Sequence, residues 1–351
     1  MEQQAIITVK DLRTYFYSDK RCNKVLNGVS FELYKGRTLC VVGESGCGKS
    51  VTASSIMQLL PKLSRIESGA ITYHSEKGDI RIDQLPRNGK EMRALRGRDI
   101  AMIFQDPMTA LNPVYTIGFQ IGEDLKYHTD LDKRSRRART LELLTQMGIS
   151  TPEKRIDQYP HEFSGGMRQR AMIAMAMSCS PKVLIADEPT TALDVTIQAQ
   201  ILELMKELQK KTHMGIIFIT HNLGVVAEIC DKVSVMYAGK IVEQGPVDDI
   251  FYKPGHPYTV GLLRSMPRVD AESYERLIPI EGTPVDMLNP PEGCPFAPRC
   301  EHAMKICLQK MPPYVELGEG HRSACWLRVQ DQLDKAGQEK PVQDQEVSGR
   351  E

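Results

Sequence analysis

The sequence lacks a charge bias, a long apolar run and a secretory leader. Lysine and arginine together number 45, as do aspartate and glutamate, so the formal net charge is zero. Proteins that bind nucleic acid or anionic membranes over a broad surface usually carry excess basic charge, so this balance disfavours those classes. No segment approaches the ~18 apolar residues that cross a bilayer. Because residues 1–4 also lack the basic and apolar parts of a signal peptide, we expect a soluble, intracellular chain.

Short C-x2-C zinc motifs are also absent, although the chain has nine cysteines. Disulfides are rare in the reducing interior of a cell, so we expect core residues, reactive thiols or metal ligands. Five cysteines are scattered, and we expect most of them to pack in the core: Cys22, Cys40, Cys47, Cys179 and Cys230. The other four, spaced C-x5-C-x6-C-x17-C, could hold Zn²⁺ or an iron–sulfur cluster as thiolates: Cys294, Cys300, Cys307 and Cys325.

Apolar runs that alternate with helical segments predict an α/β fold. Strands separated by helices indicate a mostly parallel sheet that is covered on both faces. Val/Ile alternation from Lys232, around Ala238-Gly239, indicates an additional hairpin. The expected strands are 6–9, 29–33, 39–42, 100–104, 183–186 and 215–220, and the expected helices are 49–60, 166–178 and 196–210.

Shifts in composition divide the chain. Residues 107–163 have few strand signals and include a basic helical stretch, 132–147, which we interpret as a solvated helix face. This helical subdomain interrupts a nucleotide-binding core of residues 1–106 and 164–250. Proline and glycine become frequent in an irregular extension, 251–330, and the polar residues 331–351 are expected to form a loose tail.

The segment Gly43–Ser50 has the sequence GESGCGKS and fits the P-loop pattern G-x-x-x-x-G-K-[ST]. It follows an expected strand and opens an expected helix. Backbone N–H groups of such a loop turn toward phosphate oxygens, and the helix N-terminus adds partial positive charge. The lysine would reach the β- and γ-phosphates, and the serine hydroxyl would ligate Mg²⁺. The residues expected to contact the nucleotide are Gly43, Glu44, Ser45, Gly46, Gly48, Lys49, Ser50 and Val51.

Two adjacent carboxylates, Asp187 and Glu188, follow the apolar run 183–186. Burying an ionised carboxylate is costly unless a cation or hydrogen-bond donors accompany it. Asp187, at the carboxyl end of a strand, can face the Mg²⁺ held by Ser50. Glu188 can orient and activate the attacking water as a general base. The alternative for Glu188 is an ordinary loop cap.

A further motif distinguishes among the P-loop classes. Residues 163–170 (FSGGMRQR) place Ser164, Gly165 and Gly166 at the start of an expected helix, a second position where an anion can bind. An ordinary N-cap followed by flexible glycines is the alternative. Gln105 in FQDP, TALD at 191–194 and His221 in ITHN complete the set. In this order, over about residues 5–245, the motifs resemble those of the ATPase subunit of ATP-binding-cassette (ABC) transporters.

The resemblance implies a role for each motif. Gln105 would ligate Mg²⁺ and sense the membrane partner, and His221 would contact the γ-phosphate as part of the catalytic set with Glu188 and Lys49. Asp194 would communicate across a dimer interface. The signature Ser164-Gly165-Gly166 would close over the ATP of a second subunit. Phe16 resembles the aromatic residue that stacks on adenine, with the neighbouring Tyr15 and Tyr17, or a core role for Phe16, as alternatives.

Residues 256–268 (HPYTVGLLRSMPR) and 293–300 (GCPFAPRC) are similar to the extension of ATPases that serve oligopeptide and dipeptide importers. This resemblance favours a [4Fe-4S] cluster on the four C-terminal cysteines, with zinc or free thiols as alternatives. A structural role for the group is expected, with redox sensing second. We therefore expect an α/β P-loop NTPase core with an antiparallel β subdomain, a helical insert and a small cluster-binding extension.

The resemblance implies an ATPase that energises import of dipeptides or oligopeptides at the cytoplasmic face of a bacterial or archaeal membrane. Its expected partners are two membrane-spanning permease subunits, a second ATPase subunit in a heterodimer rather than a homodimer, and indirectly a substrate-binding protein. Nickel complexes and oligosaccharides are alternative cargoes. A soluble cassette acting on DNA or ribosomes would predict a long coiled-coil insert, two cassettes or a basic face, none of which is evident. The signature motif and His221 speak against a small-molecule kinase.

Overall fold

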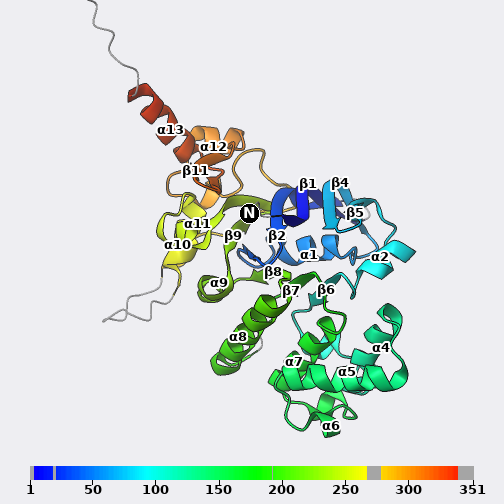
Figure 1. Cartoon of the computed structure of the whole chain (residues 1–351). Coiled ribbons are helices and arrows are strands. Elements are labelled where there is room, and N and C mark those ends of the chain that lie inside the picture. Colours follow the sequence, from blue (N-terminus) through cyan, green and yellow to red (C-terminus); the bar gives the residue numbers. More distant parts are fainter. Residues whose placement is uncertain (1–3, 19–20, 192, 267–277, 339–351) are drawn as a thin grey trace, which may run out of the picture.

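An eight-stranded sheet lies at the centre of the chain in the computed structural model, which describes residues 4–18, 21–191, 193–266 and 278–338 (Figure 1). The strand order is β11-β12-β10-β9-β3-β8-β7-β6. Strands β9, β3, β8, β7 and β6 pair in parallel, and β10, β12 and β11 join antiparallel. The bounds are β3 (Thr38–Val42), β6 (Ile100–Ile103), β7 (Val183–Asp187), β8 (Gly215–Thr220), β9 (Lys232–Tyr237), β10 (Lys240–Pro246), β11 (Val315–Gly318) and β12 (His321–Ser323).

Continuous burial explains why the inner strands are parallel. All residues of β3, β7 and β8 are buried, as expected of strands that are covered on both faces. The helices that accompany the sheet are α1 (Lys49–Ile56), α2 (Lys90–Leu95), α8 (Val195–Thr212) and α9 (Leu223–Ile229). The strand–loop–helix arrangement from β3 to α1 confirms the prediction for this part of the sequence.

A second sheet is antiparallel, with the order β2-β1-β4-β5. Its buried face, which includes Ile7, Leu12 and Leu26, shares one apolar core with Leu39 of β3 and Ile56 of α1. This core holds the second sheet against the P-loop side of the central sheet. The strands are β1 (Ala5–Ser18), β2 (Arg21–Tyr34), β4 (Ser64–Ser75) and β5 (Gly78–Arg81), of which β4 and β5 were not predicted.

The helices between residues 107 and 176 lie in the lower part of the molecule in Figure 1. Asp132 caps the second of the three longer ones by accepting a hydrogen bond from Ser135 N at 2.8 Å, which confirms the helix expected at 132–147. None of the described helices is long and apolar enough to span a membrane. The five helices are α3 (Pro107–Ala110), α4 (Ile117–His128), α5 (Lys133–Gln146), α6 (Pro152–Arg155) and α7 (Gly165–Ala176).

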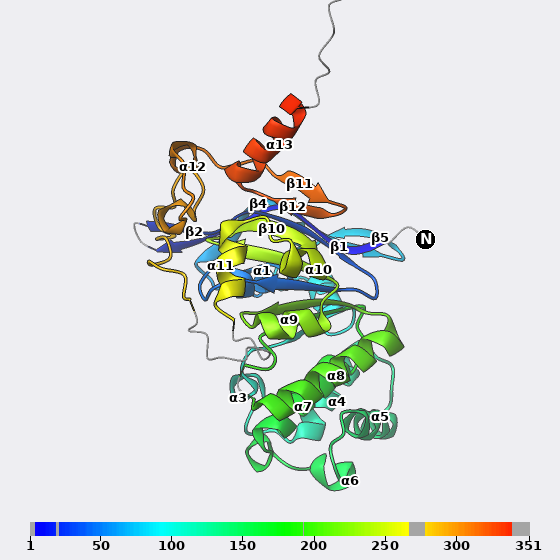
Figure 2. The ribbon, with the colours of Figure 1, turned by 90° about the vertical axis from the view of Figure 1, so that its left-hand side faces the viewer.

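The extension is more regular than predicted. Its β12 pairs with β10, so it adds two strands to the central sheet. Figure 2 shows β11, β12, α12 and α13 on the side opposite the α3–α7 helices. The last helix continues to Gln338, within the segment that was expected to be loose, and residues 339–351 lie outside the described residues. The helices are α10 (Val247–Tyr252), α11 (Pro257–Arg264), α12 (Lys305–Gln309) and α13 (Trp326–Gln338).

Two further predictions are corrected. Helix α1 ends at Ile56 rather than at residue 60, because Gln58 adopts a left-handed backbone with φ 51° and Arg96 donates to the carbonyls of Met57 and Gln58. Cys40 and Cys230 are buried in the main apolar core, as expected, but they also form a disulfide between β3 and the end of α9, which was not predicted. Their Cα atoms are 5.9 Å apart, within the range that a disulfide bridges.

Candidate functional site

The P-loop begins where β3 ends, and its glycines fit tightly. Gly43 has φ 155°, and a Cβ atom added there would lie 2.1 Å from Met236 O. Gly48, with φ 108°, would place a Cβ atom 2.8 Å from Leu26 Cδ2. Larger residues at these positions would push the loop away from β9 and β2. Glycine is therefore required for the shape of the loop as well as for access to its N–H groups.

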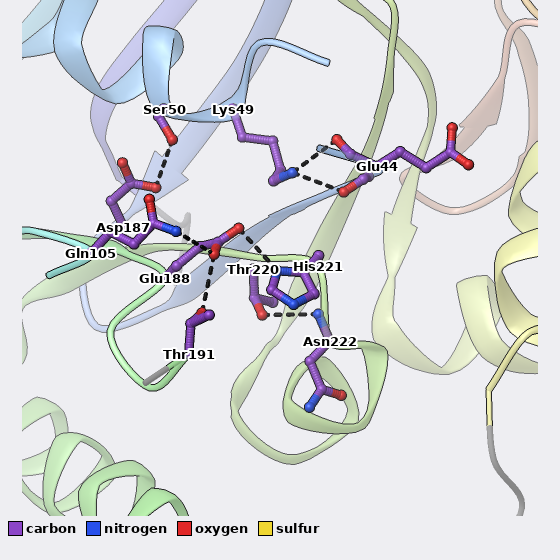
Figure 3. Close-up of polar contacts among 11 residues, drawn as sticks. Glu44, Lys49, Ser50, Gln105, Asp187, Glu188, Thr191, Thr220, His221 and Asn222 are labelled. Carbon is purple, nitrogen blue, oxygen red and sulfur yellow. Dashed lines mark hydrogen bonds and ion pairs between the residues drawn. The ribbon is translucent and has the colours of Figure 1, made fainter. Parts of the chain in front are cut away.

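Lys49 opens α1 and is 5% exposed. Its Nζ donates to the carbonyl oxygens of Gly43 and Glu44, at 2.8 and 3.0 Å. The ammonium group is therefore held across the mouth of the loop by neutral acceptors (Figure 3). Carbonyl groups solvate the cation without neutralising it, so its charge remains available to an anion in the loop.

Asp187 ends β7 and faces the start of α1. Its Oδ1 accepts a hydrogen bond from Ser50 Oγ at 3.0 Å. Burial raises the pKa of Asp187 above its ordinary value, the charge of Glu188 adds to the rise, and the Ser50 hydrogen bond and Lys49 only partly offset it. A cation beside these two oxygen ligands would reverse that shift, and hard oxygen donors are the ligands that Mg²⁺ prefers.

Glu188 is the most highly connected side chain of the site. Its Oε1 lies 3.0 Å from His221 Nδ1, and its Oε2 accepts from Gln105 Nε2 and Thr191 Oγ1, both at 3.0 Å (Figure 3). Burial alone would raise the pKa of Glu188, but the hydrogen bonds and charges of its neighbours outweigh it, led by His221, and the pKa lies below its ordinary value. The carboxylate is therefore ionised and can accept a proton.

Backbone strain fixes the direction of this side chain. Glu188 has φ 45°, which is uncommon for a residue with a Cβ atom. Its N–H donates to Ile219 O of β8 at 2.9 Å, so the strained turn is anchored to the sheet. Such strain is often found where a side chain must be held for function.

The P-loop and Glu188 border an open cleft of about 480 Å³, which Gly43, Glu44 and Asp187 do not line. It brings together several of the predicted residues, namely Ser45, Gly46, Gly48, Lys49, Ser50, Val51, Gln105, Glu188 and His221. Val25 of β2 and Thr191 also line the cleft and were not predicted. Thr191 lies in the DEPTT motif and could have been found from its spacing to Glu188, whereas no motif includes Val25.

Other predicted residues lie elsewhere. Phe16 is half-buried in β1, opposite Asn23 of β2, and does not line the cleft. Ser164 caps α7, with Gly165 exposed and Gly166 next to Ile197, and none of the three lines the cleft. Asp194 caps α8 by accepting from Ile197 N at 3.0 Å. The chain therefore does not bring its signature motif to its own P-loop.

The four C-terminal cysteines border one small cavity, together with His256 and His302. Burial raises the pKa of Cys294 to about 11, and the nearby thiols add to the rise. Burial likewise lowers the pKa of His256 to about 4. Among the described residues, no group of three or more His, Cys, Asp or Glu side chains has an arrangement that could hold a metal ion. The predicted convergence of the cysteines is confirmed, and a metal or cluster on them is not.

Comparison with known proteins adds to this geometry. A family model described as "ABC transporter" matches residues 26–191, and one described as "Oligopeptide/dipeptide transporter, C-terminal region" matches residues 242–307. The dipeptide transport ATP-binding protein DppD of Bacillus subtilis (strain 168) is 53% identical over 328 residues, covering 93% of this chain and 96% of that protein. The oligopeptide transport ATP-binding protein OppD of the same strain is also 53% identical, covering 92% of this chain and 88% of that protein.

Solved structures agree on the fold. The structure of cbiO1 from Clostridium perfringens, described as part of the ABC transporter complex cbiONQ, is 27% identical and has a TM-score of 0.59. The match covers 72% of this chain and 92% of the cbiO1 chain. The P-loop cleft, the paired carboxylates and these relatives lead to one conclusion: the chain belongs to the ABC transporter ATP-binding proteins, in the group that carries the oligopeptide/dipeptide transporter C-terminal region.

Proposed function

We propose that this chain binds and hydrolyses ATP to energise import of dipeptides or oligopeptides through a membrane complex. The observation that carries the proposal is the P-loop cleft with an ionised Glu188 in a chain whose relatives are named for dipeptide and oligopeptide transport. Those names favour peptides over nickel complexes or oligosaccharides. A cassette acting on nucleic acid has no comparable support.

Residue roles follow from the contacts. Lys49 would bind the phosphates, because its amine already lies across the loop on neutral acceptors. Ser50 and Asp187 would hold Mg²⁺ with Gln105, and the ion would supply charge stabilisation at the phosphates. Glu188 would act as the general base, oriented by hydrogen bonds from three neighbours, of which His221 would also contact the γ-phosphate.

The signature motif supports a dimer. Ser164 and Gly165 are exposed at the N-terminus of the 12-residue helix α7, away from this chain's own cleft. The N-terminus of a helix favours phosphate, so this one would bind the nucleotide of a second ATPase subunit. A second, related chain in a heterodimer remains our preferred partner. Asp194 caps α8 and would lie beside the same interface, where it would communicate with the partner subunit.

A groove between the central sheet and the α3–α7 helices provides a surface for a permease subunit. Its volume is about 800 Å³, and it is lined from both sides, by Phe104 after β6 and by Tyr127 of α4 among others. These two aromatic side chains are exposed, at 40% and 69% of residue surface. Exposed aromatic residues that border a hollow are typical of a protein interface. Gln105, whose Nε2 donates to Glu188, directly follows Phe104 in the chain. A permease helix that docked against Phe104 would therefore lie next to Gln105.

The four-cysteine cavity fits a bound group in one respect. His256 Nδ1 accepts a hydrogen bond from Tyr258 N at 3.1 Å, so the ring proton lies on Nε2. That nitrogen is buried and has no hydrogen-bond partner among the described residues, although the ring borders the cavity. An unpaired buried donor beside four thiols calls for an acceptor, as the sulfur of a [4Fe-4S] cluster or a zinc thiolate would be. Such a group would join Cys294, Cys300, Cys307 and Cys325 as a structural crosslink.

The first test is a pull-down of the tagged chain from detergent-solubilised native membranes, followed by mass spectrometry. We expect two multi-span proteins and a second cassette ATPase. Recovery of the chain alone, or with ribosomes or nucleic acid, would refute the transport role. The purified complex, returned to vesicles with its binding protein, should then take up labelled dipeptides in the presence of MgATP but not with the Glu188→Gln variant.

The Glu188→Gln variant tests the chemistry separately. Glutamine can keep two of the three hydrogen bonds but cannot take a proton, so phosphate release should fall by about 10²–10⁴-fold with ATP binding preserved. A control is Glu203→Gln, an exposed carboxylate on α8 that should leave turnover unchanged. Normal turnover in Glu188→Gln would exclude Glu188 as the base.

A further inference from the structure

The P-loop is held from outside by an arginine of the C-terminal extension. Arg299 directly precedes Cys300, and its side chain is 4% exposed. Its guanidinium donates to both carboxylate oxygens of Glu44, the second residue of the P-loop, at 2.6 and 3.0 Å. The carbonyls of Ile280 and Glu281 accept two further bonds, at 3.1 and 2.9 Å. This planar fork is therefore fixed by the extension before it reaches Glu44.

The main chain of Glu44 is held by the extension as well. Its N–H donates to Tyr258 Oη at 2.9 Å. Tyr258 is fully buried, and its ring packs against Tyr237 and Phe296 with centroids 4.6 and 5.3 Å away. Because Tyr258 belongs to α11 and Phe296 precedes Arg299, the backbone and the side chain of Glu44 are both attached to the same part of the extension.

These contacts act on the residues that would meet phosphate. The carbonyl of Glu44 is one of the two acceptors that hold Lys49 Nζ, while its carboxylate points away from the lysine (Figure 3). Without Arg299, that carboxylate would be an unpaired negative charge on the loop that receives a polyanion. Arg299 thus removes a repulsion and fixes a turn whose carbonyl positions the lysine.

We infer that Arg299 and Tyr258 are positioning residues of the ATP site, which hold Glu44 and so let the C-terminal extension set the nucleotide affinity of the cassette. This goes beyond the proposed function, which assigns the extension no part in nucleotide binding, and it rests only on the phosphate-binding role of the P-loop. The ligand in question is MgATP bound by the isolated full chain, so the inference can be tested without transport.

The test is a fluorescence titration of the full chain with MgATP. Couplings between sites are typically about 5–150-fold in affinity, and we expect Arg299→Met to weaken binding about tenfold. Arg299→Lys keeps the charge and loses the fork, so it should fall between Arg299→Met and the wild type. Tyr258→Phe should weaken binding by removing the acceptor of the Glu44 N–H. The matched control is Arg137→Met on α5, which breaks an exposed two-bond pair with Asp157 and should bind MgATP normally.

A double variant tests whether Arg299 acts through Glu44. If it does, the effects of Arg299→Met and Glu44→Gln cannot be additive, and the double variant should bind MgATP more tightly than Arg299→Met alone. Equal affinity of Arg299→Met and the wild type, or simple additivity of the two changes, would overturn the inference. If the wild type itself bound no MgATP, the proposed ATPase function would fail instead, so the two failures are distinguishable.

Hydrogen exchange of the wild type avoids the danger that a buried substitution prevents folding. Coupling between two sites is reciprocal, so MgATP should tighten the extension that holds the loop. We expect amide exchange at residues 258–260 and at 297, 299 and 300 to slow when MgATP is added, with no change at residues 153–155 of α6. Unchanged exchange in both extension segments, at nucleotide saturation, would count against the inference whatever the variants show.

Discussion

Replacing Glu243 with glutamine should loosen the attachment of the extension to the core. Glu243 lies on β10 and is fully buried. Its Oε1 accepts from Gly255 N at 2.5 Å and lies 2.8 Å from His321 Nε2, and its Oε2 accepts from His256 N at 2.9 Å. The Glu243 side chain therefore joins β10 to the residues directly before α11 and to β12.

The expected cost follows from counting donors. The single oxygen of glutamine can serve the two donors at the Oε1 position, which turns its NH₂ group toward the N–H of His256. Each buried donor left without an acceptor costs about 1–3 kcal/mol. The glutamine NH₂ and the His256 N–H face each other without an acceptor, so together they cost about 2–6 kcal/mol. Domain stabilities are about 5–15 kcal/mol, so the loss should be plainly measurable.

Hydrogen exchange at Gly255 and His256, combined with urea unfolding, measures this loss. The control is Glu316→Gln on β11, an exposed side chain that should change stability by no more than about 0.5 kcal/mol. If Glu243→Gln were no less stable than Glu316→Gln, and the two amides exchanged at the wild-type rate, the hydrogen-bond argument would be refuted.

Three other predictions concern the nucleotide site and the cysteines. The pKa of Glu188 lies below its ordinary value of 4.5, so its contacts stabilise the fold above that pH and the stabilisation is lost as the pH falls through the lower folded pKa. Urea unfolding of the wild type and of Glu188→Gln at a series of pH values measures this, and a stability difference between the two proteins that stayed constant down to acid pH would contradict it. Lys49→Ala should weaken MgATP binding at least about tenfold in a nucleotide titration, and unchanged affinity would exclude the phosphate role. Cys300→Ser should lower the metal content of anaerobically purified protein, measured by elemental analysis, and full occupancy would show that Cys300 is not a ligand.

Local patterns in the sequence predicted the chemical part of the site. The P-loop, Asp187 and Glu188 belong to contiguous motifs. The apolar runs at 39–42 and 183–186 correctly predicted the strands that carry them. The contacts between Arg299 and Glu44 join residues 255 positions apart, and nothing local to either residue indicates the other. The short strands β11 and β12, four and three residues long, are likewise defined by their pairing with β10 rather than by their own periodicity.

Other differences have similar causes. The early end of α1 depends on Arg96 reaching back to carbonyls about 40 residues earlier, which no propensity of residues 57–60 reveals. The Cys40–Cys230 disulfide depends on the approach of β3 to the end of α9, and the expectation of unpaired cysteines rested on compartment alone. Sequence patterns therefore located the reactive groups, while the supports that hold them came from tertiary contacts.

The pairing of β12 with β10 also covers what would otherwise be an edge of the central sheet. Without residues 315–323, β10 would be the outermost strand of the central sheet, and its buried Ile241 and Val242 would lie on an edge with free N–H and C=O groups. Exposed apolar edges of this kind pair with other chains and promote aggregation. In the full chain the edge passes to β11, which is short, largely exposed and carries Glu316. The extension thus closes the sheet with a strand that is poorly suited to self-association.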